Sequence, residues 1–212
     1  MNRRYFLAMT GAALVPACTT IRPEQATRPV VLPVSASSYG AVPTERFALP
    51  AIDLDEVDPR YLRRIVDYPS SEVPGTVVVD PHNRFLYLVL PEGRAMRYGI
   101  GVGRAGFAWS GRAYVGWKRP WPTWTPPASM IARQPELERY RDGMAPGLDN
   151  PLGARAIYIF EDGHDTLYRF HGTNEPWSIG KAVSSGCIRL FNQDAIDLYN
   201  RVQTGAAVVV LG

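Results

Sequence analysis

A cysteine and a histidine lie in the same stretch of the C-terminal third of the chain. Cys187 is one of two cysteines and His171 is one of three histidines, and each has a glycine beside it, Gly186 and Gly172. A thiol is nucleophilic only as the thiolate, so a catalytic cysteine needs a base for its proton or a cation for its charge. Histidine can act as either the base or the cation near neutral pH. A small buried cysteine and a hydrogen-bonded core histidine would explain the same two residues without catalysis.

Three ordered motifs around this pair favour catalysis. His171–Thr173 reads His-Gly-Thr, Ser184–Leu190 reads Ser-Ser-Gly-Cys-Ile-Arg-Leu, and Asn192–Asp194 reads Asn-Gln-Asp. Together they resemble the signature of the L,D-transpeptidase catalytic-domain family, bacterial enzymes that remodel peptidoglycan. Many members have histidine where this chain has Ser185. This departure concerns the local hydrogen bonding and not the expected reaction.

The resemblance extends over roughly residues 75–212. It includes Thr-Trp-Thr-Pro-Pro at 123–127 and Asn-Pro-Leu-Gly-Ala-Arg-Ala at 150–156. The fold that it implies is mainly β with a few short helices, arranged as a mixed β-sandwich or barrel-like core.

The resemblance also implies a cysteine-dependent acyl transfer between peptide stems. Cys187 would attack the carbonyl of the third residue of a tetrapeptide stem, release the terminal D-alanine, and pass the acyl group to an amine of another stem. Cysteine suits such a double displacement because its thiolate is both a strong nucleophile and a good leaving group. His171 would be the base, with its second ring nitrogen held by the carbonyl of Gly172. Papain-like enzymes use a side chain there, so we expect slower thiolate formation in this chain.

The tetrahedral intermediate requires hydrogen-bond donors for its oxyanion. The backbone N–H groups of Gly186 and Cys187 are the candidates. Arg189 can bind a carboxylate of the donor through a bidentate fork, or it can form a structural salt bridge within the loop. The other expected substrate contacts are Ser185, Thr173 and Asn174.

The sequence leaves the acyl acceptor open. A stem amine would give cross-links, water would give an L,D-carboxypeptidase, and a lysine of an outer-membrane lipoprotein would give anchoring of that protein to the wall. A non-catalytic wall-binding module is the alternative from another class, and the presence of His171, Cys187 and Arg189 together argues against it. Carbapenems mimic the acyl donor for this family, so the resemblance implies a covalent adduct on Cys187.

Peptidoglycan stem peptides are the expected partners, with no metal, organic cofactor or nucleic acid. His82 and His164 lie in separate predicted turns, and one histidine with one cysteine falls short of a zinc ligand set. The formal net charge is +3, and no run of lysine and arginine gives electrostatic support for nucleic-acid binding.

The N-terminus predicts export to the periplasm. Arg3 and Arg4 precede an apolar run, residues 6–17, that is too short to cross a bilayer and resembles a twin-arginine signal. An ordinary Sec signal is the alternative. Cys18 ends this segment as in a lipobox, so it is either acylated as a membrane anchor or removed by cleavage nearby. A disulfide with Cys187 would tie the export signal to the nucleophile and is not expected.

Between the signal and the catalytic domain, residues 19–49 are rich in proline, alanine, serine and threonine without apolar periodicity. This composition predicts a disordered tether. Asp58 and Pro59 then predict the start of a short helix that includes Ile65. The expected parts of the chain are an export signal at 1–18, a linker and N-terminal extension at 19–74, and the catalytic domain at 75–212.

Two predicted hairpins build the sheet that positions the pair. The first has β-rich runs at 76–79 and 84–89, and the second has runs at 156–160 and 166–170. The second hairpin continues directly into His171, which places the base at a strand end. Further strands are expected at 94–102, 107–115 and 206–211.

Trp117 to Trp124 is dense in tryptophan and proline. The prolines argue against a central strand, so the segment is either a buried loop plug or an aromatic wall beside the cleft. Residues 127–140 predict a helix, and 140–150 predict a loop that acts as a lid.

A last helix is expected after the cysteine, starting at Asn192–Asp194. Its one apolar face contains Ala195, Leu198, Tyr199 and Val202.

Overall fold

The computed structural model describes residues 35–103, 110–184 and 186–212; Cys18, Ser185 and the expected signal lie outside these ranges. The strands are β1 Arg64–Asp67, β2 Val77–Asp80, β3 Phe85–Leu90, β4 Arg94–Gly99, β5 Val102–Gly103, β6 Gly111–Pro120, β7 Arg155–Glu161, β8 His164–His171, β9 Ala182–Ser184, β10 Ile188–Arg189 and β11 Ala207–Val210. The α-helices are α1 Ala128–Arg133 and α2 Asn192–Arg201, and short 3₁₀ turns lie at Ala36–Tyr39, Leu54–Glu56, Pro59–Tyr61, Pro135–Tyr140 and Pro176–Ser178. No helix in these ranges is long and apolar enough to cross a membrane.

Nine strands form one curved sheet in the order β1-β4-β3-β2-β11-β6-β7-β8-β10. Both predicted hairpins are confirmed as β2–β3 and β7–β8. The far end of the sheet returns to its beginning, because Gly101, just after β4, exchanges two backbone hydrogen bonds of 2.9 Å with Arg189 of β10. The expected mainly β, barrel-like fold with few helices is therefore confirmed.

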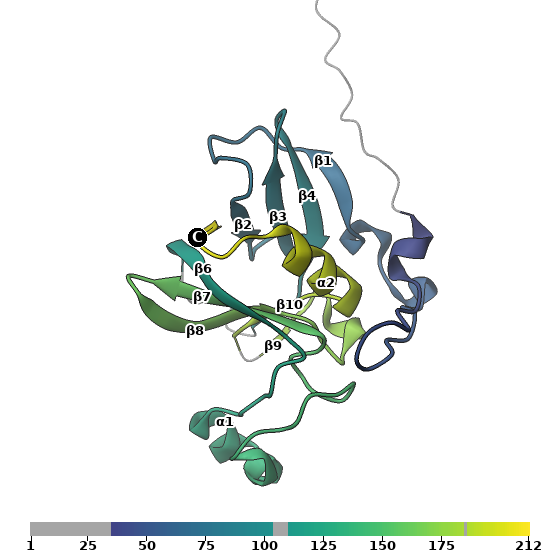
Figure 1. Cartoon of the computed structure of the whole chain (residues 1–212), viewed down its shortest axis with the longest axis vertical. Coiled ribbons are helices and arrows are strands. Elements are labelled where there is room, and N and C mark those ends of the chain that lie inside the picture. The colour runs from purple at the N-terminus through teal and green to yellow at the C-terminus, as the bar shows by residue number, and fades with distance from the viewer. Residues whose placement is uncertain (1–34, 104–109, 185) are drawn as a thin grey trace, which may run out of the picture.

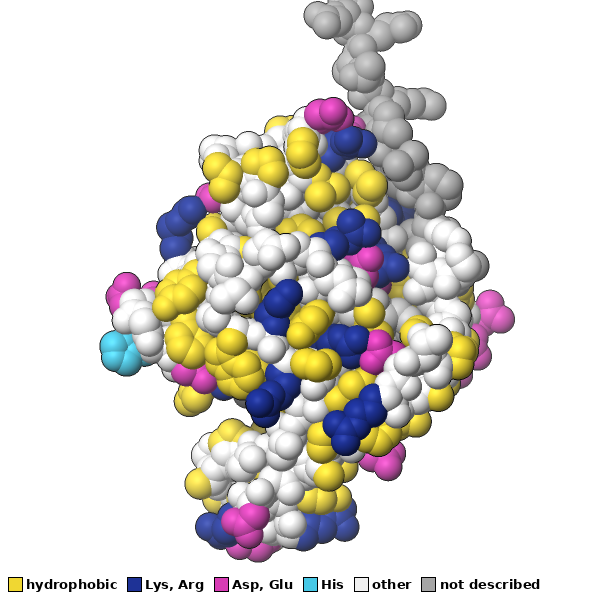
Figure 2. Space-filling model, viewed as in Figure 1, with side chains coloured by type: hydrophobic (Ala, Val, Ile, Leu, Met, Phe, Trp, Pro, Cys, Tyr) yellow, Lys and Arg dark blue, Asp and Glu magenta, His cyan; other side chains and the backbone are white. Residues whose placement is uncertain are grey.

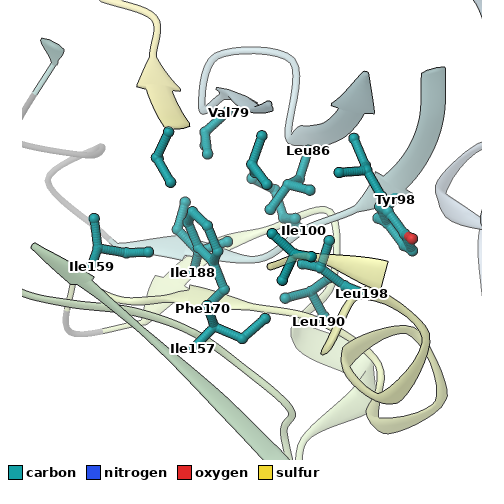
Figure 3. Close-up of a cluster of buried hydrophobic side chains, with 14 of the residues drawn as sticks. Val79, Leu86, Tyr98, Ile100, Ile157, Ile159, Phe170, Ile188, Leu190 and Leu198 are labelled. Carbon is teal, nitrogen blue, oxygen red and sulfur yellow. The ribbon is translucent and has the colours of Figure 1, made fainter. Parts of the chain in front are cut away.

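The hydrophobic core lies between the two halves of this sheet (Figure 1). Side chains from β2, β3 and β4 meet side chains from β7, β8, β10 and α2, and Figure 3 shows them pointing toward one another. Buried members include Val79, Leu86, Phe170, Ile188 and Leu198. Fully burying a side chain of this size stabilises the fold by about 1.5–3 kcal/mol, so this cluster fixes the strand ends that carry the site.

Helix α2 begins at Asn192 as expected, and its predicted apolar face is confirmed. Ala195, Leu198 and Val202 are buried in the core, while Tyr199 is partly buried against it. The last strand, β11, pairs in parallel with β2 and antiparallel with β6. It therefore lies inside the sheet, as its continuous apolar sequence predicts.

The tether predicted for residues 19–49 is wrong for its described end. Tyr39 is 1% exposed and Leu49 is 3% exposed, and both pack on the body of the protein. The Tyr39 hydroxyl donates a hydrogen bond of 3.1 Å to Asp194 in α2. Isolated apolar residues in a polar segment gave no periodic signal, yet Tyr39 and Leu49 are each buried in a hydrophobic cluster of the folded protein.

The helix predicted at Asp58 stops earlier than expected. Asp58 does cap the turn, since its carboxylate accepts a hydrogen bond of 3.0 Å from the N–H of Arg60. The helical turn ends at Tyr61, and the residues from Arg64 form strand β1 against β4 instead. Pairing with an available sheet edge has overridden the local helical pattern.

Strand β6 extends further than the prolines suggested. It runs to Pro120, and its end pairs with β7 on one side only, because β11 pairs with residues 111–114. A missing N–H is tolerated where a strand has no neighbour on that side. Residues 117–120 are thus not part of a strand paired on both sides, as expected, but the loop predicted for them is wrong because they continue β6.

The helix predicted at 127–140 is two short helical pieces. Helix α1 ends at Arg133, and Pro135 starts a separate 3₁₀ turn. The residue before a proline disfavours helical geometry, and Gln134 is extended there (φ −137°, ψ 79°). These two pieces, residues 128–140, form a lobe that stands away from the main body in Figure 2. Across the face of the molecule in this view, the basic side chains are dispersed and not gathered in one patch.

Candidate functional site

The end of β8 and the short strand β10 place four side chains on one face. The strands are parallel neighbours, with Arg189 beside His171 and Ile188 beside Phe170. Side chains alternate along a strand, so Ile188 and Phe170 point into the core and are 0% and 2% exposed. The alternate positions, Arg169, His171, Cys187 and Arg189, all line a single cleft.

The cleft has a volume of about 1050 Å³. Part of its lining is the β8–β10 face, and another part comes from residues 123–137, including Met130 and Leu137. Residues 140–150, predicted as the lid, contribute no lining side chain. Residues of the helical segment at 123–137 therefore line the cleft, whereas the segment at 140–150 that was predicted as the lid does not.

His171 is held by backbone contacts on several sides. It is the last residue of β8, is 4% exposed, and has its Nδ1 2.5 Å from the carbonyl oxygen of Gly172. This is the contact that the resemblance implied. The side chain of Asn192 links the loop after His171 to the residue before β7. It accepts from the N–H of Ala154 at 2.8 Å and donates to the carbonyl of Thr173 at 2.9 Å.

Gly172 is required by this arrangement for a steric reason. A Cβ at this position would lie 2.1 Å from Oδ1 of Asn192 and 3.1 Å from the N of Ala154. Only a residue without a side chain lets the loop after His171 approach Asn192 so closely.

The imidazole is neutral at physiological pH. Burial lowers the pKa of His171 from 6.5 to about 4, and the positive charges of Arg189 and Arg169 act in the same direction. The carbonyls of Gly172 and Pro151 oppose this shift in the pKa. If Nδ1 donates its hydrogen to the Gly172 carbonyl, Nε2 carries the lone pair and is the basic atom.

The thiol is neutral as well. Cys187 is a partly exposed cysteine whose Sγ lies 3.7 Å from the carbonyl oxygen of Leu167. Burial raises the pKa of the Cys187 thiol, while the positive charge of Arg169, a hydrogen bond with its backbone and the charge of Arg189 act against that rise. The resting pair is thus thiol and imidazole and not thiolate and imidazolium.

A bulge in β8 brings the Leu167 carbonyl to the sulfur. The register between β7 and β8 shifts, so that Phe160 faces Asp165 and Tyr158 faces Arg169. Leu167 lies in this irregular stretch with φ +63°, which is unfavourable for leucine, and its side chain is 74% exposed. Bulges of this kind often lie beside active sites, where they re-aim backbone and side-chain groups.

Two ion pairs hold the arginines of the cleft. Arg169 binds Asp165 through two contacts of 2.8 and 2.9 Å, and its guanidinium lies 4.4 Å from the ring centroid of Tyr158. Arg189 binds Glu175 at 2.6 Å. The salt bridge considered for Arg189 is therefore present, and the same side chain also lines the cleft.

Comparison with known proteins adds the family. The model of the YkuD family, described as the L,D-transpeptidase catalytic domain, matches residues 74–210. The chain belongs to this family.

Relatives and a solved structure agree with this assignment. The chain is 35% identical over 147 residues to the probable L,D-transpeptidase YcfS and 34% identical over 145 residues to the probable L,D-transpeptidase YbiS, both of Escherichia coli K12. These alignments cover 68% and 66% of this chain but 45% of each relative, so the chain spans less than half their length.

A crystal structure from Brucella melitensis, described as a probable carnitine operon oxidoreductase caia, is 46% identical to this L,D-transpeptidase family member. The match covers 75% of this chain and 99% of that one, with a TM-score of 0.52. It shows a shared fold.

The structure of this L,D-transpeptidase family member places the remaining expected residues as follows. Gly186 has φ +141°, a conformation that favours glycine, directly before the cysteine. Asn174 lines the cleft, as expected. Thr173 does not: it is 3% exposed, its hydroxyl accepts from the N–H of Glu175 at 3.0 Å, and it borders a smaller cavity instead. His82 and His164 are exposed.

The tryptophan segment combines both of its predicted roles. Trp121 is a plug: it is 5% exposed, packs on Phe47 and donates to Glu45 at 2.8 Å. Trp124 lines the cleft. Trp117 stacks on Tyr158 at 3.6 Å between ring centroids.

Several site residues were missed from the sequence. Arg169 lies two positions before His171, and this spacing on a strand was the available signal that it shares the histidine's face. The roles of Asp165, Leu167 and Glu175 depend on strand register and loop geometry, for which the sequence carried no local signal. Within the described ranges, no three His, Cys, Asp or Glu side chains gather where they could hold a metal ion.

Proposed function

We propose that this chain is a peptidoglycan L,D-transpeptidase that works through a thioester on Cys187. The thiol attacks the carbonyl of the third residue of a tetrapeptide stem, the bond to the terminal D-alanine breaks, and an amine of a second stem then displaces the sulfur. The observation that carries this proposal is the placement of Cys187, His171 and two arginines on one face of one cleft, in a chain of this family.

Because both partners are neutral at rest, the proton leaves the sulfur as the sulfur attacks. Nε2 of His171 receives it and returns it to the departing amine of D-alanine. The Gly172 carbonyl supports this role, because it holds Nδ1 at 2.5 Å and stabilises the positive charge that the ring acquires. A backbone carbonyl carries only a partial charge, so the imidazolium is stabilised less than it would be by a carboxylate.

The oxyanion of the tetrahedral intermediate is bound by the N–H groups of Gly186 and Cys187. The positive φ of Gly186 supports this assignment, since it turns the peptide just before the nucleophile. Losing one donor of this type typically costs about 3 kcal/mol in transition-state stabilisation.

The donor stem carries carboxylates, and the cleft offers arginines to bind them. Arg189 of β10 and Arg169 of β8 line the same cleft as Cys187. Each is already oriented by a carboxylate partner, Glu175 and Asp165, which reduces the entropy lost when a substrate binds.

The proposed site of action is the periplasm, reached through the N-terminal signal. Arg3 and Arg4 before a short apolar run support export, and Cys18 supports a lipid anchor. Mass analysis of the mature N-terminal peptide tests both: an acylated peptide beginning at Cys18 is expected, and an unmodified later start would exclude the anchor.

Incubation of the purified chain with a tetrapeptide stem tests the reaction itself. We expect release of D-alanine and a cross-linked product whose mass equals two stems less one D-alanine. A product shortened by hydrolysis alone would instead identify an L,D-carboxypeptidase. Transfer only to a lysine peptide would identify lipoprotein anchoring, and binding of stems without any turnover would identify a wall-binding module.

A further inference from the structure

Residues 42–49 of the N-terminal segment form a closed loop on the surface of the domain. Val42 and Leu49 exchange backbone hydrogen bonds of 3.0 and 3.2 Å, which join the two ends of the loop. Leu49 is 3% exposed in a hydrophobic cluster. Figure 1 shows the loop, in dark blue, beside α2, and Gln193 of α2 donates to the carbonyl of Pro50, just after the loop, at 3.0 Å. The side chain at the tip of the loop is therefore carried by a fixed backbone.

Glu45 lies at this tip and forms a largely buried ion pair with Arg155, the first residue of β7. Its carboxylate oxygens accept hydrogen bonds of 2.5 and 2.9 Å from the guanidinium, and one of them also accepts 2.8 Å from the indole N–H of Trp121. The side chains of Glu45 and Arg155 are 14% and 11% exposed. Removing two charges from water offsets much of their attraction, so stability alone is a weak explanation for this pair.

Glu45 lies outside residues 74–210, the part of the chain that the family model matches. The hydrogen bond from Arg155 lowers the pKa of the Glu45 carboxyl, although burial opposes this shift, so the carboxylate is charged at neutral pH. A charged group of the N-terminal segment is thus fixed against the start of a strand that pairs with the strand of the catalytic histidine.

Arg155 connects this ion pair to the peptides beside His171. Its guanidinium donates to the carbonyl of Ala154 at 2.8 Å, and its own carbonyl accepts from the N–H of Gly172 at 3.0 Å. The carbonyl of Gly172 in turn lies 2.5 Å from Nδ1 of His171. The path from Glu45 to the imidazole therefore passes through two residues.

Asn192 of α2 couples the same peptides a second time. Its Oδ1 accepts from the N–H of Ala154 at 2.8 Å, and its Nδ2 donates to the carbonyl of Thr173 at 2.9 Å. A Cβ on Gly172 would lie only 2.1 Å from this Oδ1, so the loop after His171 is packed closely against Asn192. A shift of the Ala154 peptide would therefore be passed on to that loop.

We propose that Glu45 is a positioning residue for the reaction, which through Arg155 fixes the Gly172 carbonyl and with it the ring of His171. The inference rests on the proposed function, because it concerns the base of that reaction. Glu45 is not among the described residues that line the cleft. It therefore acts on the geometry of proton transfer and not on the binding of substrate.

Glu45→Gln tests this role, because the amide keeps the size of the side chain and removes its charge. Saturation kinetics with a carbapenem separate the Kd of the first complex from the maximum rate of acylation. We expect the maximum rate to fall about ten- to a hundredfold, since a misplaced reacting group costs rate. The Kd should not change, because the lining of the cleft is unaltered. A purely structural role would lower the melting temperature and leave the rate as it is.

The ring of His171 provides a second readout that does not depend on turnover. The chain has three histidines, and His82 and His164 are exposed, so the ring N–H that is protected from exchange in protein with isotope-labelled histidine should be that of His171. We expect its NMR signal to shift and to exchange faster with water in Glu45→Gln. An unchanged signal would contradict the positioning role.

The matched control is Glu72→Gln. Glu72 also binds an arginine through two contacts, both of 2.8 Å to Arg112, and neither residue lines the cleft. Its acylation rate and histidine signal should equal those of the wild type. Arg155→Lys is a second test variant if Glu45→Gln does not fold. Lysine keeps the charge but lacks the fork that binds Glu45 and the Ala154 carbonyl together, so it should slow acylation in the same way.

The outcomes separate this role from the proposed function. If the wild type is not acylated at all, the proposed function is wrong and Glu45 has no reaction to support. If the wild type is acylated and both test variants react at its rate, only the positioning role is wrong. The same holds if they are slowed only through a higher Kd, or if Glu72→Gln is slowed as much.

Discussion

At the scale of the residue, Cys187 and His171 are both neutral in the resting protein. Burial lowers the pKa of His171 to about 4 and raises the pKa of Cys187, so neither group is charged at neutral pH. A preformed ion pair, as in papain-like enzymes, would require the opposite shifts. In the proposed mechanism, the sulfur therefore gains its negative charge only as its proton moves to His171.

A neutral resting thiol on Cys187 predicts how its alkylation depends on pH. The ultraviolet absorbance of thiolate, measured as the difference between the wild type and Cys187→Ala, should be negligible at neutral pH and should rise only in alkaline solution. The rate of alkylation by iodoacetamide should rise with it. A thiolate signal that persists to mildly acidic pH would show an ion pair and contradict the assignment.

Arg189 either binds a carboxylate of the donor or forms a structural salt bridge with Glu175, and variants of the two residues separate these interpretations. If Arg189 binds the donor, Arg189→Ala should raise KM for a tetrapeptide about ten- to a hundredfold, in line with a lost charged hydrogen bond. Glu175→Gln removes the ion pair but keeps the arginine, and should change KM less. Equal loss in both variants, accompanied by a lower melting temperature, would assign Arg189 to loop structure alone.

At the scale of the element, the bulge in β8 links strain to function. The N–H of Leu167 is held by Asp165 at 2.9 Å, and its carbonyl faces the sulfur. A non-glycine residue with positive φ costs about 1–2 kcal/mol, and asparagine tolerates this conformation better than leucine does.

Leu167→Asn is therefore expected to raise the free energy of unfolding by about 0.5–1 kcal/mol, since the exposed leucine loses little burial. Leu167→Val is the matched control, because a β-branched residue fits this conformation worse and should lower stability. Urea unfolding measures both. A loss of stability in the asparagine variant would show that the leucine side chain, and not backbone strain, determines the balance.

The elements were predictable where local chemistry decided them. The two hairpins consist of β-branched and aromatic runs on either side of turn residues, and α2 has apolar residues at helical spacing, so pattern and structure agree. The end of β6, residues 117–120, was missed because its prolines were judged as if this part of the strand were paired on both sides. Whether an edge is free depends on β11, which is far away in the sequence.

The site divides in the same way. Cys187 and His171 were visible because motifs surround them, and the contact of His171 with Gly172 followed from the resemblance. The positions of Asp165 and Leu167 result from a register shift against β7, and that of Glu175 results from the loop before β9. These positions depend on tertiary pairing, which no local pattern in the sequence reveals.

At the scale of the whole molecule, a buried polar cluster joins the N-terminal segment to α2. Asp194 is 0% exposed and lies 3.4 Å from Arg63 and 3.1 Å from the Tyr39 hydroxyl. Burial raises the pKa of the Asp194 carboxyl from 3.8 to about 7, although Arg63 and Tyr39 oppose this shift. The cluster helps to hold Tyr39, Arg63 and the segment between them against α2.

This shift predicts a loss of stability as the pH rises from about 4 to about 7. The folded-state pKa of Asp194 lies above the unfolded value, so its contribution to stability is complete below about pH 4 and is lost as the pH rises through about 7. Asp194→Asn cannot ionise. Relative to this variant, the wild type should lose about 2 kcal/mol of unfolding free energy between about pH 5 and pH 8.

His171 does not obscure this test. Its folded-state pKa is lowered from 6.5 to about 4, so it reduces stability as the pH falls through that window, in both proteins alike. Asp67→Asn, an exposed substitution, is the control. Parallel curves for the wild type and Asp194→Asn would show that the buried carboxylate is charged in the folded protein throughout.

The central claim is that the sulfur of Cys187 forms an acyl-enzyme with the help of His171. Intact-mass measurement after incubation with a carbapenem tests it most directly. We predict an added mass equal to one carbapenem on the wild type, none on Cys187→Ala, and formation slowed by about a hundredfold or more in His171→Ala. An unmodified wild type, or an adduct that persists in Cys187→Ala, would contradict the claim.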